Sequence, residues 1–164
     1  MANLFQIEKY LRKKKIPYKV VDLGGEVFTV DEVKKTGVEE GEIVKTLIVR
    51  VEELNKTQFV VLAVRGCDRV DFKKVRRLFG PSTALRVNCE LAKADEVEKV
   101  CGVPIGAVCP ILLEVPLYFD RKVMSLKHVN MGSGDLTKGL EMDISGLLEA
   151  VGKYQVEDLV ILLT

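Results

Sequence analysis

One lysine stands out because its neighbours are apolar. Lys45 follows Ile43 and Val44 and precedes Thr46 and a further apolar run at residues 47–49, so a cation lies at the start of a strand-like stretch. Two interpretations are open. The aliphatic stem can lie along apolar surface while the ammonium reaches water. Alternatively, the ammonium points into a cleft and stabilises an anionic or polarised group of a ligand.

A loop rich in glycine and proline is the second candidate for chemistry. Residues 101–110 read CGVPIGAVCP, which places Gly102, Pro104, Gly106 and Pro110 in a mostly apolar stretch. This composition predicts an irregular loop within an apolar wall. Its backbone amides could donate several hydrogen bonds to one oxygen, and glycine would allow a ligand to approach closely. An ordinary structural turn is the alternative interpretation, because a Gly-x-x-x-Pro string is common.

Conventional catalytic and metal-binding patterns are weak. His128 is the single histidine and falls in an expected strand, where a packed side chain is the commoner arrangement. The four cysteines, Cys67, Cys89, Cys101 and Cys109, include no Cys-x-x-Cys pair. We therefore expect reduced, mostly buried thiols and no metal or other cofactor. A metal or redox protein remains an alternative if the cysteines converge, and zinc or cobalt content would test it.

The composition fits one globular domain, which we expect to cover residues 1–164. Hydrophobic residues make up 48% of the 164 positions, enough for a core without disulfides. The longest apolar run, residues 59–64, is too short to cross a bilayer, so we expect a cytoplasmic protein without membrane contact. The 25 basic and 24 acidic residues nearly cancel. Any contact with RNA would therefore depend on local basic runs at residues 12–15 and 73–77.

Short strands and helices alternate along the chain, and they must position these residues. Capping signals and apolar spacing predict helices near residues 4–15, 29–37, 71–80 and 143–152, and a further short helix that ends at Gly102. Apolar and β-branched runs predict strands at residues 18–21, 45–51, 57–64, 108–113, 117–120, 127–131 and 139–142, and a buried closing strand at residues 156–163. The polar link 52–56 favours a hairpin. This order predicts a mixed α/β domain rather than a regular β-α-β alternation.

Four segments together resemble the YbaK/ProX family of aminoacyl-tRNA editing domains. They are VKTLIV at 44–49, VLAVRG at 61–66, GAVCP at 106–110 and LYFD at 117–120, in the family's order and spacing. These domains are similar to the editing insertion of bacterial prolyl-tRNA synthetases. Free-standing members deacylate mischarged tRNAs such as Cys-tRNA(Pro) or Ala-tRNA(Pro). The resemblance implies an α/β fold in which a mixed, barrel-like β-sheet is flanked by helices.

The resemblance also implies roles for particular residues. Lys45 looks like the family's essential, catalytic lysine, and Thr46 follows it as in the motif. The loop would hold the terminal ribose and the ester, while a water, activated with help from the substrate's own 2′-hydroxyl, attacks the ester carbonyl. The substrate-binding residues implied are Phe28, Thr46, Gly106, Ala107, Val108, Cys109, Pro110, Gly132 and Ser133. Cys109 stands where the family often has serine, which would weaken a hydroxyl contact, and Phe28 could equally be a core residue.

The leading hypothesis is an enzyme, an aminoacyl-tRNA deacylase that removes a wrong amino acid from the 3′ end of a tRNA. The expected partners are a mischarged tRNA, bound through its aminoacyl-adenosine end, and an aminoacyl-tRNA synthetase. The alternative is a non-catalytic relative of the same fold that binds tRNA ends or a synthetase. The sequence identifies neither the amino acid nor the tRNA, because selectivity depends on residues scattered along the chain.

Overall fold

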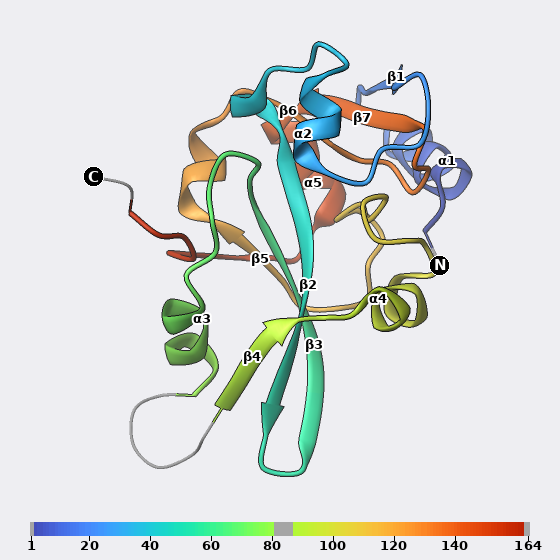
Figure 1. Ribbon diagram of the computed structural model, residues 1–164. Coiled ribbons are helices and arrows are strands. Elements are labelled where there is room, and N and C mark those ends of the chain that lie inside the picture. Colours follow the sequence, from blue (N-terminus) through green and yellow to red (C-terminus); the bar gives the residue numbers. More distant parts are fainter. Residues whose placement is uncertain (1, 81–86, 163–164) are drawn as a thin grey trace.

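The strands of this computed structural model, which describes residues 2–80 and 87–162, form two sheets (Figure 1). The larger sheet has the order β4-β2-β3-β5-β8, and the smaller has the order β1-β7-β6. The β3–β5 and β5–β8 pairs are parallel. The bounds are β1 Lys19–Asp22, β2 Val44–Glu53, β3 Lys56–Arg65, β4 Val87–Leu91, β5 Leu117–Asp120, β6 His128–Gly132, β7 Lys138–Asp143 and β8 Gln155–Glu157. The predicted mixed α/β class is confirmed.

The first three helices begin where the capping signals predicted. Asn3 caps α1 in a capping box with Gln6, Thr29 accepts the Glu32 amide at α2, and Asp71 accepts the Lys73 amide at α3. The helices are α1 Leu4–Lys14, α2 Val30–Lys34, α3 Phe72–Phe79, α4 Ala94–Cys101 and α5 Ile144–Val151, with short 3-10 segments η1 Glu40–Glu42 and η2 Arg121–Ser125. None of the described helices is long and apolar enough to cross a membrane.

The β2–β3 hairpin is the centre of the fold, and both of its faces are buried. Its register runs from Val44 opposite Arg65 to Glu53 opposite Lys56. Val61 and Ala63 belong to one hydrophobic cluster, whereas Val60, Leu62 and Val64 belong to another, as expected for alternating side chains. Figure 1 shows α3 on one side of the hairpin, and the smaller sheet with α1 at the opposite end of the molecule. Burial on both faces explains why β3 is an almost continuous apolar run.

Two predicted strands differ from the structure. Residues 108–113 are irregular instead, with a turn at 111–112, because Pro110 has no N–H to pair and Leu112 has a positive φ angle. The closing strand is limited to β8, and residue 163 lies outside the described residues. Beyond β8 the Leu159 amide donates to the buried Asp120 carboxylate (2.8 Å) rather than to a strand.

Candidate functional site

A cavity of about 280 Å³ lies where β2 and β6 separate. Among the described residues, an isolated parallel bridge joins Asn130 of β6 to Ile43, the residue just before β2. On the same side, β4 begins to pair with β2 only at Val49. The first residues of β2 therefore present a free edge, and the cavity lies along it. The remaining walls come from residues 23–33, 105–108 and 130–139.

Thr46 presents unpaired polar groups to this cavity. The Ile48 carbonyl on the same strand accepts the Ala92 amide (2.9 Å), on the side away from β3. Because alternate residues of an antiparallel strand direct their main-chain groups to the same side, the N–H and C=O of Thr46 point to the free edge. The Thr46 hydroxyl is also buried, and none of the described residues gives it a hydrogen bond. Buried polar groups are normally paired, so this arrangement indicates a place for a ligand.

Lys45 carries a half-buried cation at the edge of the same cavity. Its ammonium donates one hydrogen bond to the main-chain oxygen of Asp68 (2.6 Å). Burial lowers the pKa of Lys45, and the nearby charge of Asp68 opposes that effect. An ammonium has three N–H donors, so two remain for a ligand. Lys45 therefore lies among the residues that line a cleft, and its side chain leaves β2 on the face opposite to that of Thr46.

The glycine-proline loop reaches the cavity through two of its five motif residues, Gly106 and Val108. Neither amide donates to another part of the described chain. The Ala107 amide, in contrast, donates to Pro104 (3.0 Å), and Pro110 has no N–H. Ala107, Cys109 and Pro110 are buried behind the cavity wall and do not line it. Two free amides are therefore available to a ligand oxygen.

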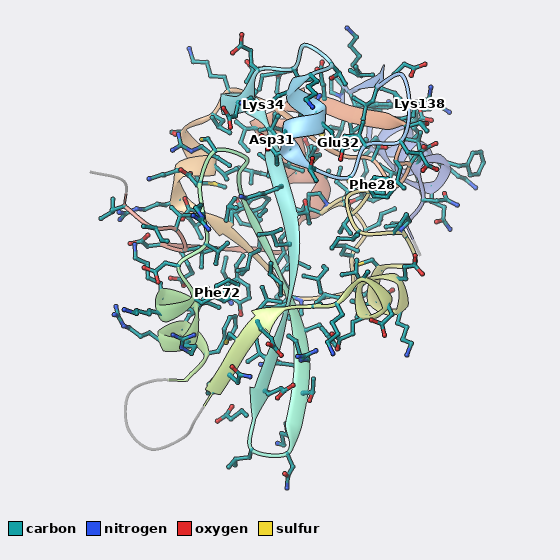
Figure 2. The ribbon with its side chains drawn as sticks, in the orientation of Figure 1. Phe28, Asp31, Glu32, Lys34, Phe72 and Lys138 are labelled. Atoms are coloured by element: carbon teal, nitrogen blue, oxygen red, sulfur yellow. The ribbon has the colours of Figure 1, made fainter. Side chains whose placement is uncertain are left out.

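Gly106 holds the loop against the backbone of Phe28. Its φ is +92°, and a Cβ there would lie 2.9 Å from both the Cα and the carbonyl oxygen of Phe28. The glycine that we expected to admit a ligand thus admits another segment of the chain. Phe28 itself lines the mouth of the cavity and is 47% exposed, which excludes a core position. Figure 2 shows it beside α2, where its amide donates to Glu32 (3.4 Å).

The Gly-Ser turn contributes one residue to the cavity. Gly132 lines it, and a Cβ at this position would lie 2.3 Å from the Val108 oxygen, so glycine is required for the two segments to meet. Ser133 is fully buried and does not line the cavity. Its hydroxyl lies 2.7 Å from the Lys138 carbonyl and accepts the Asp135 amide (3.2 Å). The structure therefore places Ser133 in the turn that supports the site rather than at the site.

None of the four cysteines lines the cavity. Cys89, Cys101 and Cys109 are buried, and Cys67 is exposed. Burial raises the pKa of Cys109 to about 12, with only partial opposition from the Ile111 amide. Within residues 2–80 and 87–162, no three ligating side chains gather into a metal site. The thiol of Cys109 therefore does not replace a serine hydroxyl at the cavity.

Four polar residues of the cavity, Thr29, Asn130, Asp135 and Lys138, were missed by the sequence analysis. Asn130 is buried, and its amide nitrogen donates to Glu141 (3.0 Å). Asp135 accepts two hydrogen bonds from Thr137, which hold the pKa of its carboxyl below the usual value. Lys138, labelled in Figure 2, pairs with Asp22 (3.0 Å). A polar asparagine within the apolar stretch HVNMG was the one available signal.

Comparison with known families agrees with this geometry. The family model described as an aminoacyl-tRNA editing domain matches residues 25–150, which include the whole cavity apart from Leu23. The chain belongs to the aminoacyl-tRNA editing domain family. The predicted family resemblance is confirmed.

Curated relatives of this editing domain are much longer proteins. The Proline--tRNA ligase of Caldicellulosiruptor bescii is 32% identical over 108 residues, and that of Caldicellulosiruptor saccharolyticus is 33% identical over 109 residues. Each match covers 65% of this chain but only 17% of the ligase. The editing domain thus corresponds to a small part of each ligase.

Solved structures match the editing domain over nearly its whole length. A crystal structure of a candidate trans-editing enzyme for prolyl tRNA synthetase has a TM-score of 0.74 and 27% identity, and the match covers 96% of both chains. A second structure, of a protein described as hypothetical, has a TM-score of 0.74 and 31% identity, with coverage of 94% of this chain and 99% of the other.

Proposed function

We propose that this editing domain hydrolyses the ester bond of mischarged aminoacyl-tRNA in trans. One observation carries the proposal: Lys45, Thr46 with its unpaired hydroxyl, and Gly106 and Val108 with their free amides all line one largely apolar cavity. Such a site combines an apolar space for an aminoacyl side chain with donors for an ester oxygen. The similarity to Proline--tRNA ligases and to a candidate prolyl trans-editing enzyme supports Cys-tRNA(Pro) and Ala-tRNA(Pro) as the first substrates to test.

In the proposed reaction a water oxygen adds to the ester carbonyl carbon, and the bond to the ribose oxygen then breaks. The products are the free amino acid and the tRNA with its terminal hydroxyl restored. Free amides in the 106–108 segment would stabilise the developing oxyanion, and Lys45 would hold the 3′ end and stabilise charge near the ester. An activated ester needs little beyond positioning and charge stabilisation, so no side-chain nucleophile is required.

In the part of the chain that the structure describes, the ionisable side chains of the cavity wall include no good general base for activating the water. They are Lys45, Asp135 and Lys138 within the described residues. Asp135 is a weak base because its hydrogen bonds to Thr137 lower the pKa of its carboxyl. His128 does not line the cavity and lies 3.6 Å from both Glu141 and Asp143. We therefore assign activation of the water to the 2′-hydroxyl of the substrate, as the family resemblance implies.

Contact with the tRNA body would use local basic surface, because the net charge is only +1. On α3 the side chains of Lys73, Arg76 and Arg77 are exposed, whereas Lys74 is paired with Asp158 (2.9 Å). A second basic run, Arg12 to Lys14, closes α1. Neutralising these side chains should weaken tRNA binding more at low salt than at high salt.

A deacylation assay against a panel of mischarged tRNAs tests the proposal. Cys-, Ala- and Ser-tRNA(Pro) come first, each with Lys45→Ala as the inactive control, and each with and without added prolyl-tRNA synthetase. We expect turnover of at least one substrate, and stimulation by the synthetase would identify it as a partner. Intact tRNA binding without turnover across the panel would instead identify a non-catalytic relative of the fold.

A further inference from the structure

The turn that follows β3 is fixed to the rest of the molecule at both ends. At its start, the Gly66 amide donates to the Ile43 carbonyl (2.6 Å), two residues before Lys45. At its end, the Asp68 amide donates to the Arg65 carbonyl (3.0 Å). The same two residues also form a two-point ion pair, with Arg65 Nε 2.7 Å and Nη2 3.1 Å from the two carboxylate oxygens of Asp68. Asp68 is only 4% exposed.

This turn supplies the hydrogen-bond acceptor of Lys45. The Lys45 ammonium donates to the main-chain oxygen of Asp68, and the side chain of that same residue is held by Arg65. A lysine side chain has four rotatable bonds, so its ammonium needs a fixed acceptor to stay in one place. We propose that the Arg65–Asp68 ion pair is a positioning device that holds the Lys45 ammonium in place and keeps it charged at the cavity. The proposal rests on the proposed function of Lys45.

The charges around Lys45 support a role for the Asp68 carboxylate beyond structure. Burial disfavours the charged amine, and Arg69 adds to that effect, whereas Asp68 and Cys67 favour the charge. Asp68 is the larger of the two favourable influences. Across the cavity, Asp135 accepts a hydrogen bond from Thr137, and Lys138 forms an ion pair with Asp22. Removing the Asp68 charge should therefore lower the pKa of Lys45 further.

The test is Asp68→Asn, which keeps the shape and the main-chain oxygen but removes the charge. The pKa of Lys45 is measured by 13C NMR of its ε-carbon in the intact protein, with Lys45→Arg assigning the signal. The pH profile of deacylation is measured in parallel. We expect the NMR titration and the alkaline limb of the rate profile to move together to lower pH, by about one pH unit. Asp68→Glu should restore most of the shift. Asp158→Asn, which removes a carboxylate paired with Lys74 instead, should move neither.

Each outcome separates this inference from the proposed function. An unchanged Lys45 titration in folded Asp68→Asn overturns the inference, whatever the activity. A shifted titration with an unchanged rate profile supports the inference and overturns the proposed role of Lys45 in the reaction. If Asp68→Asn does not fold, Arg65→Lys serves in its place, because it keeps the charge but loses the planar two-point contact. It should shift the Lys45 ε-carbon signal and its titration and lower kcat several-fold with little change in KM. An unchanged Lys45 signal overturns the inference, whereas a changed signal with an unchanged kcat overturns the proposed role of Lys45 in the reaction.

Discussion

The two halves of β2 have the same neighbour on one side and different neighbours on the other. Both halves pair with β3 over the full length of the hairpin. From Val49 onward β4 closes the second edge, and Arg50 is paired with Glu52 (2.8 Å), Glu96 (2.5 Å) and Glu90. Pairing on that side already begins with the Ile48 carbonyl, and the free stretch before it carries Lys45 and the unpaired Thr46 hydroxyl. The closed half pairs its charged side chain with carboxylates of the protein, even though Arg50 Nε makes no hydrogen bond, and the open half leaves the Thr46 hydroxyl with no polar partner among the described residues.

This difference shows how a strand within a core can contribute a functional site. Apolar burial is similar in the two halves, since Val44 and Ile48 are as buried as Val49 and Val51. What changes is the point at which the neighbouring strand begins. Unpaired polar groups cost free energy unless a ligand restores their hydrogen bonds. Substitutions in the open half should therefore affect activity, and substitutions in the closed half should affect stability.

The largest expected effect comes from Lys45→Ala. We expect deacylation to fall by about 10²-fold or more, equivalent to ~2.7 kcal/mol, because one electrostatic stabiliser is removed. The free energy of unfolding should change by ~1 kcal/mol or less, the scale of one hydrogen bond. Steady-state kinetics and urea unfolding measure the two quantities.

Arg50→Met in the closed half is the matched control for Lys45→Ala. It should lower the urea midpoint, because three carboxylates lose their shared partner, and should leave kcat/KM unchanged. Wild-type turnover in Lys45→Ala would remove this residue from the mechanism. It would also contradict the expectation that the open half of β2 serves activity and the closed half serves stability.

The next effect is expected from Gly106→Ala. Its positive φ and the contact with Phe28 should together lower the free energy of unfolding by ~2 kcal/mol, and displacement of the loop amides should lower deacylation by about tenfold. Gly152→Ala has a similar φ, +71°, but open space around the added Cβ. That control should lose only ~1 kcal/mol of stability and no activity. Equal rates in the two variants would mean that the Phe28 contact does not position the site.

Thr46→Val should have a smaller effect, and it should raise stability while it lowers activity. Removing a buried hydroxyl that lacks a partner should raise the free energy of unfolding by ~1 kcal/mol. If the hydroxyl binds the substrate, deacylation should fall by about fivefold, equivalent to ~1 kcal/mol. Thr57→Val, at an exposed position of β3, should change neither quantity. A stabilised variant with full activity would show that the hydroxyl is not used.

The smallest effect concerns the thiols beside the two halves. Cys67 is exposed near Lys45, whereas Cys89 is buried opposite Val51 in the closed half. Burial also raises the pKa values of Cys101 to about 11 and Cys109 to about 12, so almost no thiolate is present at pH 8. We expect one thiol to react rapidly with Ellman's reagent in the native protein and four after unfolding in urea. Rapid reaction of a second thiol would show that a buried segment opens.

Local patterns in the sequence predicted most elements but not the cavity. The hairpin was predictable because two β-branched runs flank a polar link, and Lys45 was noticeable because a cation interrupts one of them. The free edge was not, because it depends on where β4 starts to pair and on the bridge between Ile43 and Asn130, which lie far apart in the chain. Ser133 was assigned to the site from its motif alone, and a motif does not show which way a side chain points.

Close backbone contacts at two glycines hold together the segments that form the cavity, whereas side chains determine the volume of the cavity. Gly106 meets the backbone of Phe28, and Gly132 meets the carbonyl of Val108, so three distant segments are fastened main chain to main chain. At both places the atoms nearest to the glycine are backbone atoms. Replacing Phe28, Val33 or Ile105 can therefore change the volume and shape offered to a ligand without moving the amides that would hold its reactive group. A domain built this way can change which side chain it accepts while keeping one reaction geometry.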